Sequence, residues 1–246
     1  GRATLRNVTM TTTGQINIVD GTLRNDFNSS NWSGNTADMD ISAGAILDLY
    51  ADAIYVNKLT GTGFVQNGYG NSSGQSGASA FIEKLVVGVA GGSSTFGGVI
   101  RNNATNTAPA GAAAGGGVQL EKVGAGTLTL GGVNLYTGTT AINVGTLLVN
   151  GATATGSAVS IAAGATLGGT GVVGGTVNVV GGAPGGHVSP GNSPGVLGTG
   201  SITWNGGSTF DVEIDGTAGA GAVGGHDQLV VTGSVTLGGA TLNLSG

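Results

Sequence analysis

Glycine and leucine recur together at a fixed interval in the second half of this chain. A Gly-x-Leu or Gly-x-x-Leu sequence begins at Gly126, Gly145 and Gly164, nineteen residues apart each time. Between the glycines, polar and apolar residues alternate, as in the segment 127–130 (TLTL), so that one side of each segment is apolar. Spacing of about twenty residues is the signature of a solenoid, in which stacked repeats share one core. The pattern therefore predicts short strands that meet at glycine corners, where the backbone needs positive φ.

Three sequence blocks carry a more specific signal. The first is a set of spaced positions: Lys122, Gly124, Gly126, Thr127, Leu128, Leu130, Asn134, Tyr136, Gly138, Gly145 and Leu147. The second is a turn sequence, Pro190, Gly191, Asn192, Ser193, Pro194 and Gly195, and the third is HDQLVV at 226–231. Together these blocks resemble the passenger-associated strand repeat, the PGNSPG turn and the later coils of bacterial autotransporter passengers. Residues 93–246 fit that family well, whereas residues 1–92 resemble it only in the general character of their sequence, without a matching motif.

The resemblance implies a right-handed parallel β-helix that a bacterium secretes or displays on its surface. We therefore expect an all-β fold, a single parallel β-solenoid with short strands, glycine corners and a few loop excursions. One domain should span residues 1–246, with irregular coils and loops in 1–122 and regular repeat coils in 123–246. About ten to twelve coils are expected.

Several local assignments follow from the alternation of apolar and polar residues. Surface loops are predicted at 25–38, 66–79 and 102–117, which are rich in Asn, Ser and Gly. Strands rather than a helix are predicted in 40–55, because Gly44 interrupts the helical alternative. The other predicted strands include 3–9, 15–19, 81–89, 95–100, and 140–144 with Ile142 and Val144 on one face.

Charge is sparse and unevenly distributed along the chain. Charged residues make up 8% of the sequence, and all seven basic residues lie at or before Lys122. Beyond it there are only four acids and no base, a surface that cannot neutralise phosphates or anionic lipids. We therefore expect neither nucleic-acid binding nor direct membrane insertion, and no run of 18 apolar residues is present. The absence of cysteine excludes disulfides and thiolate metal sites.

Asp211, Glu213 and Asp215 alternate along FDVEID and are predicted to share one strand face. They are a candidate site for a hard cation such as calcium. The favoured interpretation is a solvated polar face opposite Phe210 and two aliphatic residues, so no metal or cofactor is expected.

Patterns typical of catalytic and nucleotide-binding sites occur in the sequence, but the structural features that these sites need are missing. GNSPG at 191–195 has the form of a nucleophile elbow, yet Pro194 has no N–H for an oxyanion hole. GTGVVG at 169–174 is followed by a strand pattern rather than a helix. His226 and Asp227 are neighbours and should point to opposite faces. We therefore expect no enzyme, and we expect the scattered Trp and Tyr residues to pack in the core or at corners.

The predicted function is a non-catalytic extracellular rod, acting in adhesion, matrix building or self-assembly, with a host or matrix surface as the partner. Two alternatives remain open. The chain could be a filament subunit that joins end to end through its terminal coils, because strand patterns at both ends read as uncapped edges. It could also bind or degrade polysaccharides, in which case any catalytic site would have to lie in residues 1–122, which contain all the Lys and Arg residues.

Overall fold

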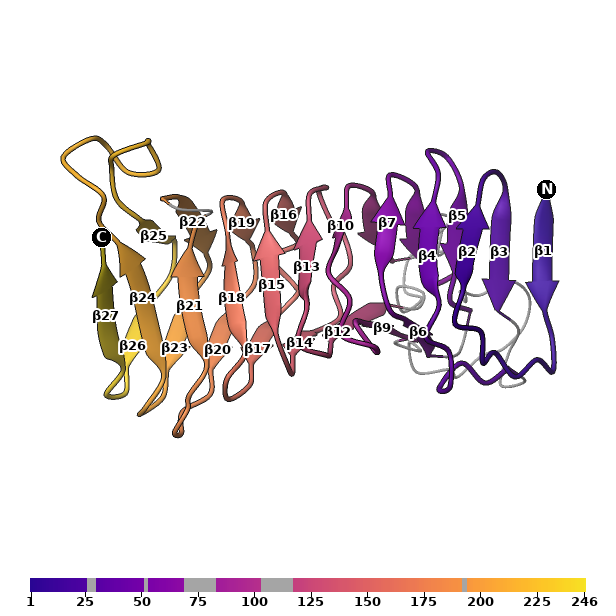
Figure 1. Cartoon of the computed structure of the whole chain (residues 1–246), viewed down its shortest axis with the longest axis horizontal. Helices are drawn as coiled ribbons and strands as arrows, with labels where there is room; N and C mark the ends of the chain where they lie inside the picture. Colours follow the sequence, from indigo (N-terminus) through magenta and orange to yellow (C-terminus); the bar gives the residue numbers. More distant parts are fainter. Residues whose placement is uncertain (26–29, 51–52, 69–82, 103–116, 192–193) are drawn as a thin grey trace, which may run out of the picture.

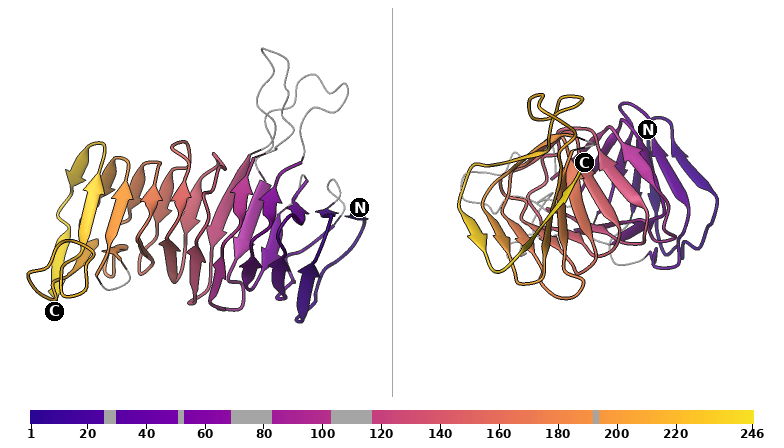
Figure 2. Two further views of the ribbon diagram at one scale, coloured as in Figure 1. Left: turned by 90° about the horizontal axis from the view of Figure 1, so that it is seen from above. Right: turned by 60° about the vertical axis from the view of Figure 1, so that its left-hand side comes forward.

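The protein is a straight stack of β-coils with its two termini at opposite ends (Figures 1 and 2). The computed structural model describes residues 1–25, 30–50, 53–68, 83–102, 117–191 and 194–246. Within these ranges the chain forms strands, turns and bends, and no helix is long and apolar enough to cross a membrane. The strands form four sheets, and the strands within each sheet pair in parallel.

The largest sheet runs the length of the rod with ten strands. In stacking order they are β2 (Gln15–Ile18), β4 (Asp38–Ile41), β7 (Leu59–Gly61), β10 (Ser94–Phe96), β13 (Thr127–Leu130), β15 (Thr146–Val149), β18 (Thr166–Gly169), β21 (His187–Pro190), β24 (Thr209–Glu213) and β27 (Thr241–Ser245). At a strand spacing of about 4.8 Å, ten strands give a sheet on the order of 45 Å long.

An eight-stranded sheet forms the second face of the rod. It consists of β6 (Ile54–Val56), β9 (Glu83–Val87), β12 (Val118–Lys122), β14 (Thr140–Ile142), β17 (Val159–Ile161), β20 (Val177–Val179), β23 (Ile202–Trp204) and β26 (Val235–Leu237).

Two smaller sheets share the third face. The first contains β1 (Arg2–Leu5), β3 (Thr22–Asn25), β5 (Ile46–Asp48), β8 (Phe64–Gln66) and β11 (Val99–Arg101). The second contains β16 (Ala152–Thr153), β19 (Val172–Val173), β22 (Val196–Thr199) and β25 (Gln228–Val231). Residues 133–135 connect them, because Val133 bridges to Ala152 and the Leu135 N–H donates to the Ile100 carbonyl. Each complete coil therefore visits three faces in a fixed order, and the expected parallel β-solenoid is confirmed.

The core is a set of aliphatic ladders that run along the rod axis. On the eight-stranded sheet, Ile142, Ile161, Val179 and Trp204 stack in register, each at most 3% exposed. Burial of one such side chain stabilises the fold by about 1.5–3 kcal/mol. Because side chains alternate between faces, a slip of one residue would turn a whole ladder outward. The alternation that the sequence shows therefore fixes the register of each coil.

Several predicted strands end earlier than the alternation suggested. The strand predicted at 3–9 is β1, which ends at Leu5. The segment 95–100 is two strands, β10 and β11, because the chain turns a corner at Gly97 and Gly98. Strand β14 ends at Ile142, so Ile142 is buried but Val144 is 48% exposed, and the prediction that both lie on one face of a strand was wrong.

The segment 25–38 is not simply a surface loop. Trp32 and Asn35 are both buried, and the Trp32 indole N–H donates to the Asn25 side-chain oxygen. Trp32 and Asn35 therefore pack inside the first coils. The polar composition of the segment led to the prediction of a surface loop instead. Most of the two other predicted loops, 66–79 and 102–117, lies outside the described residues, because residues 69–82 and 103–116 are not described. The segment 40–55 contains strands as predicted, apart from residues 51 and 52, which are not described.

The coil length is close to, but not fixed at, nineteen residues. Thr127 pairs with Thr146, which in turn pairs with Thr166 and then His187, so the successive steps are 19, 20 and 21 residues. Gly145 lies at one corner with φ 73°, and a Cβ there would come within 2.5 Å of two backbone carbonyl oxygens. Close approach of stacked corners therefore explains why glycine marks the repeat.

Adjacent residues of β13 should respond very differently to the same substitution. Leu128 is 1% exposed, whereas Thr129 faces outward and is partly exposed. Leu128→Asp buries an unpaired carboxylate and should lower the free energy of unfolding by roughly 3 kcal/mol or more, or prevent folding. Thr129→Asp should change it by less than about 1 kcal/mol. Urea unfolding followed by circular dichroism measures both, and equal destabilisation would contradict the inward and outward assignment.

Candidate functional site

Lys122 occupies a position in the core ladder that is otherwise apolar. It is the last residue of β12 and lies in register between Val87 and Ile142. Its side chain is 0% exposed. Val118 and Leu120 precede it on the same inner face of β12. Because side chains alternate along the strand, Lys122 also points into the interior of the rod.

Three backbone carbonyls hold the Lys122 ammonium. Nζ donates to the carbonyl oxygens of Val123 and Gly124, each at 2.7 Å, and of Val144 at 3.1 Å. The first two belong to its own corner, and the third belongs to the next coil. Burial lowers the pKa of Lys122 from 10.5 to about 8, because the interior disfavours the charged form. The lysine thus links two coils through donors that an aliphatic side chain lacks.

Asn134 performs the same task on the third face. It is 1% exposed, and its side-chain oxygen accepts the Ile100 N–H of the preceding coil at 2.9 Å. Its side-chain nitrogen donates to the carbonyls of Gly132 at 3.0 Å and Ala152 at 3.3 Å. This one amide therefore connects three successive coils, in place of the missing strand between β11 and β16.

Tyr136 closes the remaining corner. Its hydroxyl is hydrogen-bonded to that of Thr140 at 2.7 Å, and the Thr140 hydroxyl is 3.1 Å from the Ser157 hydroxyl. All three residues are at most 1% exposed, and burial raises the pKa of Tyr136. Next to the tyrosine, a Cβ on Gly138 would lie 2.2 Å from the Val118 carbonyl oxygen, so this tight corner requires glycine.

We call the contacts of Lys122, Asn134 and Tyr136 the corner clamps. One lies at or beside each of the three corners of the coil that begins with β12. Each clamp ends on a group of the following coil: the Val144 carbonyl, the Ala152 carbonyl and the Thr140 hydroxyl. The polar residues that stand out in the sequence motif are thus internal, and their chemistry is used to join coils.

The second motif, the proline–glycine turn, is tied to the third by Asp227. The Asp227 carboxylate accepts the Gly195 N–H at 2.7 Å and the Glu213 N–H at 2.9 Å. Asp227 is 8% exposed, and Gly191 has φ 94° at the start of the turn. Asn192 and Ser193, the centre of the predicted turn, lie outside the described residues. The HDQ block therefore contributes a buried carboxylate that anchors the turn.

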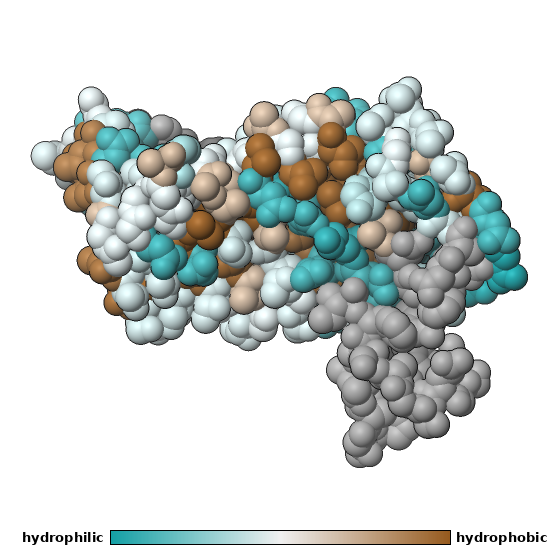
Figure 3. Space-filling model, turned by 90° about the horizontal axis from the view of Figure 1, so that it is seen from below, coloured by the Kyte–Doolittle hydropathy of each residue, from teal (hydrophilic) through white to brown (hydrophobic). Residues whose placement is uncertain are grey.

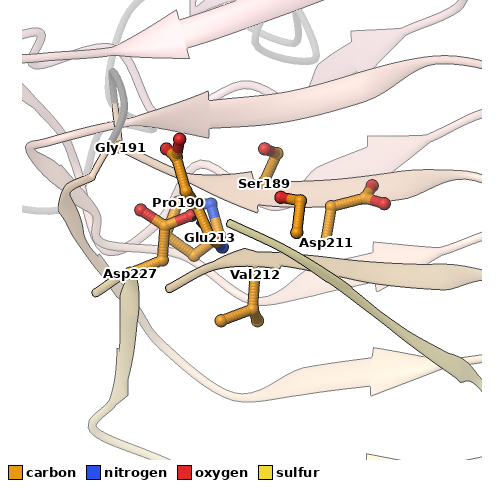
Figure 4. A pocket seen from close by; sticks show the side chains of 8 residues that line it. Ser189, Pro190, Gly191, Asp211, Val212, Glu213 and Asp227 are labelled. Atoms are coloured by element: carbon orange, nitrogen blue, oxygen red, sulfur yellow. Dashed lines mark hydrogen bonds between the residues drawn. The ribbon is translucent and has the colours of Figure 1, made fainter. Parts of the chain in front are cut away.

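The predicted acidic face forms part of an open groove of about 390 Å³ near the C-terminal end (Figure 4). Its lining includes Ser189, Asp211, Glu213, Asp227 and Ser245. Asp211 is already engaged, since its carboxylate is 2.8 Å from His187 Nδ1 and accepts from the Asn243 amide at 2.9 Å.

Asp215 lies beyond the end of β24 and outside this lining. Desolvation and the neighbouring Glu213 and Asp227 carboxylates raise its pKa. Strand β24 therefore brings together two of the three predicted acids and not the third. In the part of the chain that the structure describes, no three His, Cys, Asp or Glu side chains are placed to hold a metal ion.

The aromatic residues are mainly structural, as predicted. Trp32, Tyr136 and Trp204 are buried in the core, and Trp204 packs against Phe210 with ring centroids 5.7 Å apart. Arg24 lies over Tyr50 at 4.2 Å from the ring centre. Tyr69 lies outside the described residues.

Sequence reasoning placed Lys122, Asn134 and Tyr136 in a structural motif but missed that their polar groups are buried. The signal was present for Lys122, because it is in phase with Val118 and Leu120 along β12. For Asn134 no such signal was present, because alternation in the VNL triplet predicts that its apolar neighbours face inward, whereas the structure exposes both neighbours and buries Asn134.

Comparison with known proteins identifies the same segment. The family described as passenger-associated-transport-repeat matches residues 120–149, which contain all three clamp residues. No curated protein matches the chain. The matched repeat and the parallel solenoid together support the resemblance to autotransporter passengers.

The lowered pKa of Lys122 predicts a distinctive pH dependence. Lys122→Met keeps the side-chain length but removes the donors, and should lower the free energy of unfolding at pH 7 by roughly 1–3 kcal/mol, because carbonyls are left unpaired. Between pH 8 and 10.5 the unfolded lysine still binds its proton while the folded one has released it, so folding of the unmodified chain becomes more favourable as pH rises.

The stability difference between the two chains should therefore widen over this window, by about 1–3 kcal/mol. Paired urea titrations at pH 7, 8, 9 and 10 measure it, and the comparison cancels titration of groups that both chains share. A difference that stays constant from pH 7 to 10 would contradict burial of a charged ammonium.

Proposed function

We propose that this chain, which carries an autotransporter passenger repeat, is a non-catalytic rod that a bacterium secretes or displays on its surface. In this role the solenoid is a rigid support for contacts along its flanks, and those contacts serve adhesion or matrix building. The observation that supports the proposal is that the matched repeat forms coils of the rod and joins them. Residues 120–149 match the passenger repeat, and the polar groups of its clamp residues join coil to coil inside the rod.

The flanks offer a surface suited to extended contacts. Thr127, Thr146 and Thr166 stand in register on the outer side of the ten-stranded sheet, one in each coil. Regular spacing of about 4.8 Å between coils presents such side chains as a row along the rod. Repeat proteins use surfaces of this kind to bind partners over many weak contacts.

Protease treatment of intact bacteria tests the proposed location. Antibodies raised against residues 1–246 should lose their epitope when intact cells are treated with a protease, or should detect the chain in the medium. An epitope that is destroyed only after the cells are lysed would contradict an extracellular role.

Bead attachment tests adhesion separately from location. Beads coated with the folded chain should attach to host-cell or matrix-coated surfaces under flow, whereas beads coated with the Leu128→Asp chain should not, because a misfolded chain lacks the ordered flank. Equal attachment of both kinds of bead would count against a specific adhesive surface, even where the location is confirmed.

The face of the rod seen in Figure 3 carries brown apolar patches among polar atoms, near its middle as well as at its left-hand end. Both kinds of surface are therefore presented along the rod.

A further inference from the structure

Residues 118–153 differ from the rest of the rod in how their coils are joined. This segment, the clamped coil pair, contains β12 to β16 and all three corner clamps. Elsewhere in the described chain, buried polar side chains also reach across coils. The Asn35 amide donates to the Tyr55 carbonyl at 2.7 Å, and the Asn67 amide to the Gly117 carbonyl at 3.3 Å. Among the coils that the structure describes, the clamped coil pair is distinguished by having such a contact at or beside every corner.

The clamp contacts that join the two coils are local in sequence. The Lys122 contact with Val144 spans 22 residues, the Asn134 contact with Ala152 spans 18, and the Tyr136 contact with Thr140 spans 4. The Asn134 contact with Ile100, which spans 34 residues, joins the pair to the preceding coil instead. By comparison, the register between β10 and β13 joins Ser94 to Leu128, and that between β24 and β27 joins Thr209 to Thr241. Other junctions, such as Ile46 with Phe64, are as local as those of the clamped coil pair, so the pair is distinguished by its clamps and not by locality alone. Short separations lower the entropy lost on closing a coil, and local contacts form early in folding.

Forming the first pair of coils is the difficult step for a solenoid. A single coil cannot bury its apolar face, so two coils must be ordered before either is stable, and later coils then add to an existing template. A pair that gains three buried clamps in addition to its aliphatic ladder crosses this barrier most easily. Leu128 and Leu147 stack in register within the pair, so apolar burial and polar clamping coincide there.

From this geometry we infer that the clamped coil pair is the folding nucleus of the chain. The remaining coils add to it in both directions, towards β1 and towards β27. The inference concerns how the rod is built and does not depend on where the protein acts, so it stands or falls independently of the proposed function.

Two leucines form a matched pair that tests the inference. Leu147 lies in β15 within the clamped coil pair, and Leu197 lies in β22 outside it, and both are 0% exposed. Leu147→Ala should slow refolding more than tenfold and change the unfolding rate less than threefold, because its contacts are already formed in the transition state. Leu197→Ala should do the reverse. The inference is overturned if Leu197→Ala slows refolding as much as Leu147→Ala does.

Pulse-labelling hydrogen exchange on the unmodified chain gives a second readout, which holds even if a variant fails to fold. During refolding of residues 1–246, backbone amides of β12 to β15 should gain protection before those of β4, β5, β23 and β24. Protection that appears first in either outer group, or at the same time everywhere, would overturn the inference.

Discussion

The stacking of parallel coils imposes one constraint on this molecule: an inward side chain is apolar, or it needs a hydrogen-bond partner inside the rod. Among the described residues Thr199 Oγ1 and Trp204 Nε1 are exceptions, because they are buried without a partner. A buried polar group without a partner costs about 1–3 kcal/mol, and an unpaired buried charge costs more. Most inward positions satisfy the constraint with Val, Leu and Ile. The coil that begins with β12 satisfies it differently, by directing an ammonium, an amide and a phenol towards groups that the neighbouring coils supply. The glycine corners make this arrangement feasible, because they let backbone carbonyls of stacked coils approach closely.

The alternation and the glycine spacing were sufficient to predict the solenoid and the inward side of β13 and β15. They could not predict where a strand ends. Val144 follows Ile142 in phase but lies past a corner, because the chain turns towards Gly145 to reach the next face. The sequence pattern also could not show whether a coil has nineteen or twenty residues, because an extra residue at a corner leaves the ladders in register.

Polar composition was a poor guide to burial. The segment around Trp32 contains Asn and Ser, as loops do, yet Asn35 is buried and donates across coils. Lys122 is the clearest example, because its charge suggested a surface position while its phase within β12 placed it inside. For the acids of the FDVEID segment, alternation predicted the shared face but could not identify a hydrogen-bond partner. Asp211 and Glu213 both line the groove. The partner of Asp211, His187, is 24 residues away and could be found only from the register of β21 and β24.

A molecule whose motif residues point inward separates support from recognition. The repeat then determines the geometry of the rod, and in the proposed role outward positions such as Thr127, Thr146 and Thr166 would be free to vary with a partner. This division explains how a specific sequence signal can mark a chain without revealing what the chain contacts.

The central claim, that a lysine ammonium is sealed inside the rod by backbone carbonyls, can be tested by amine labelling of the native protein followed by mass spectrometry. The chain has three lysines, and the side chains of Lys58 and Lys84 are 40% and 41% exposed, whereas Lys122 is 0% exposed. At pH 8, Lys58 and Lys84 should be acetylated rapidly, and Lys122 should react only at the rate of unfolding. Acetylation of Lys122 in the folded chain at the rate of Lys58 would contradict the account.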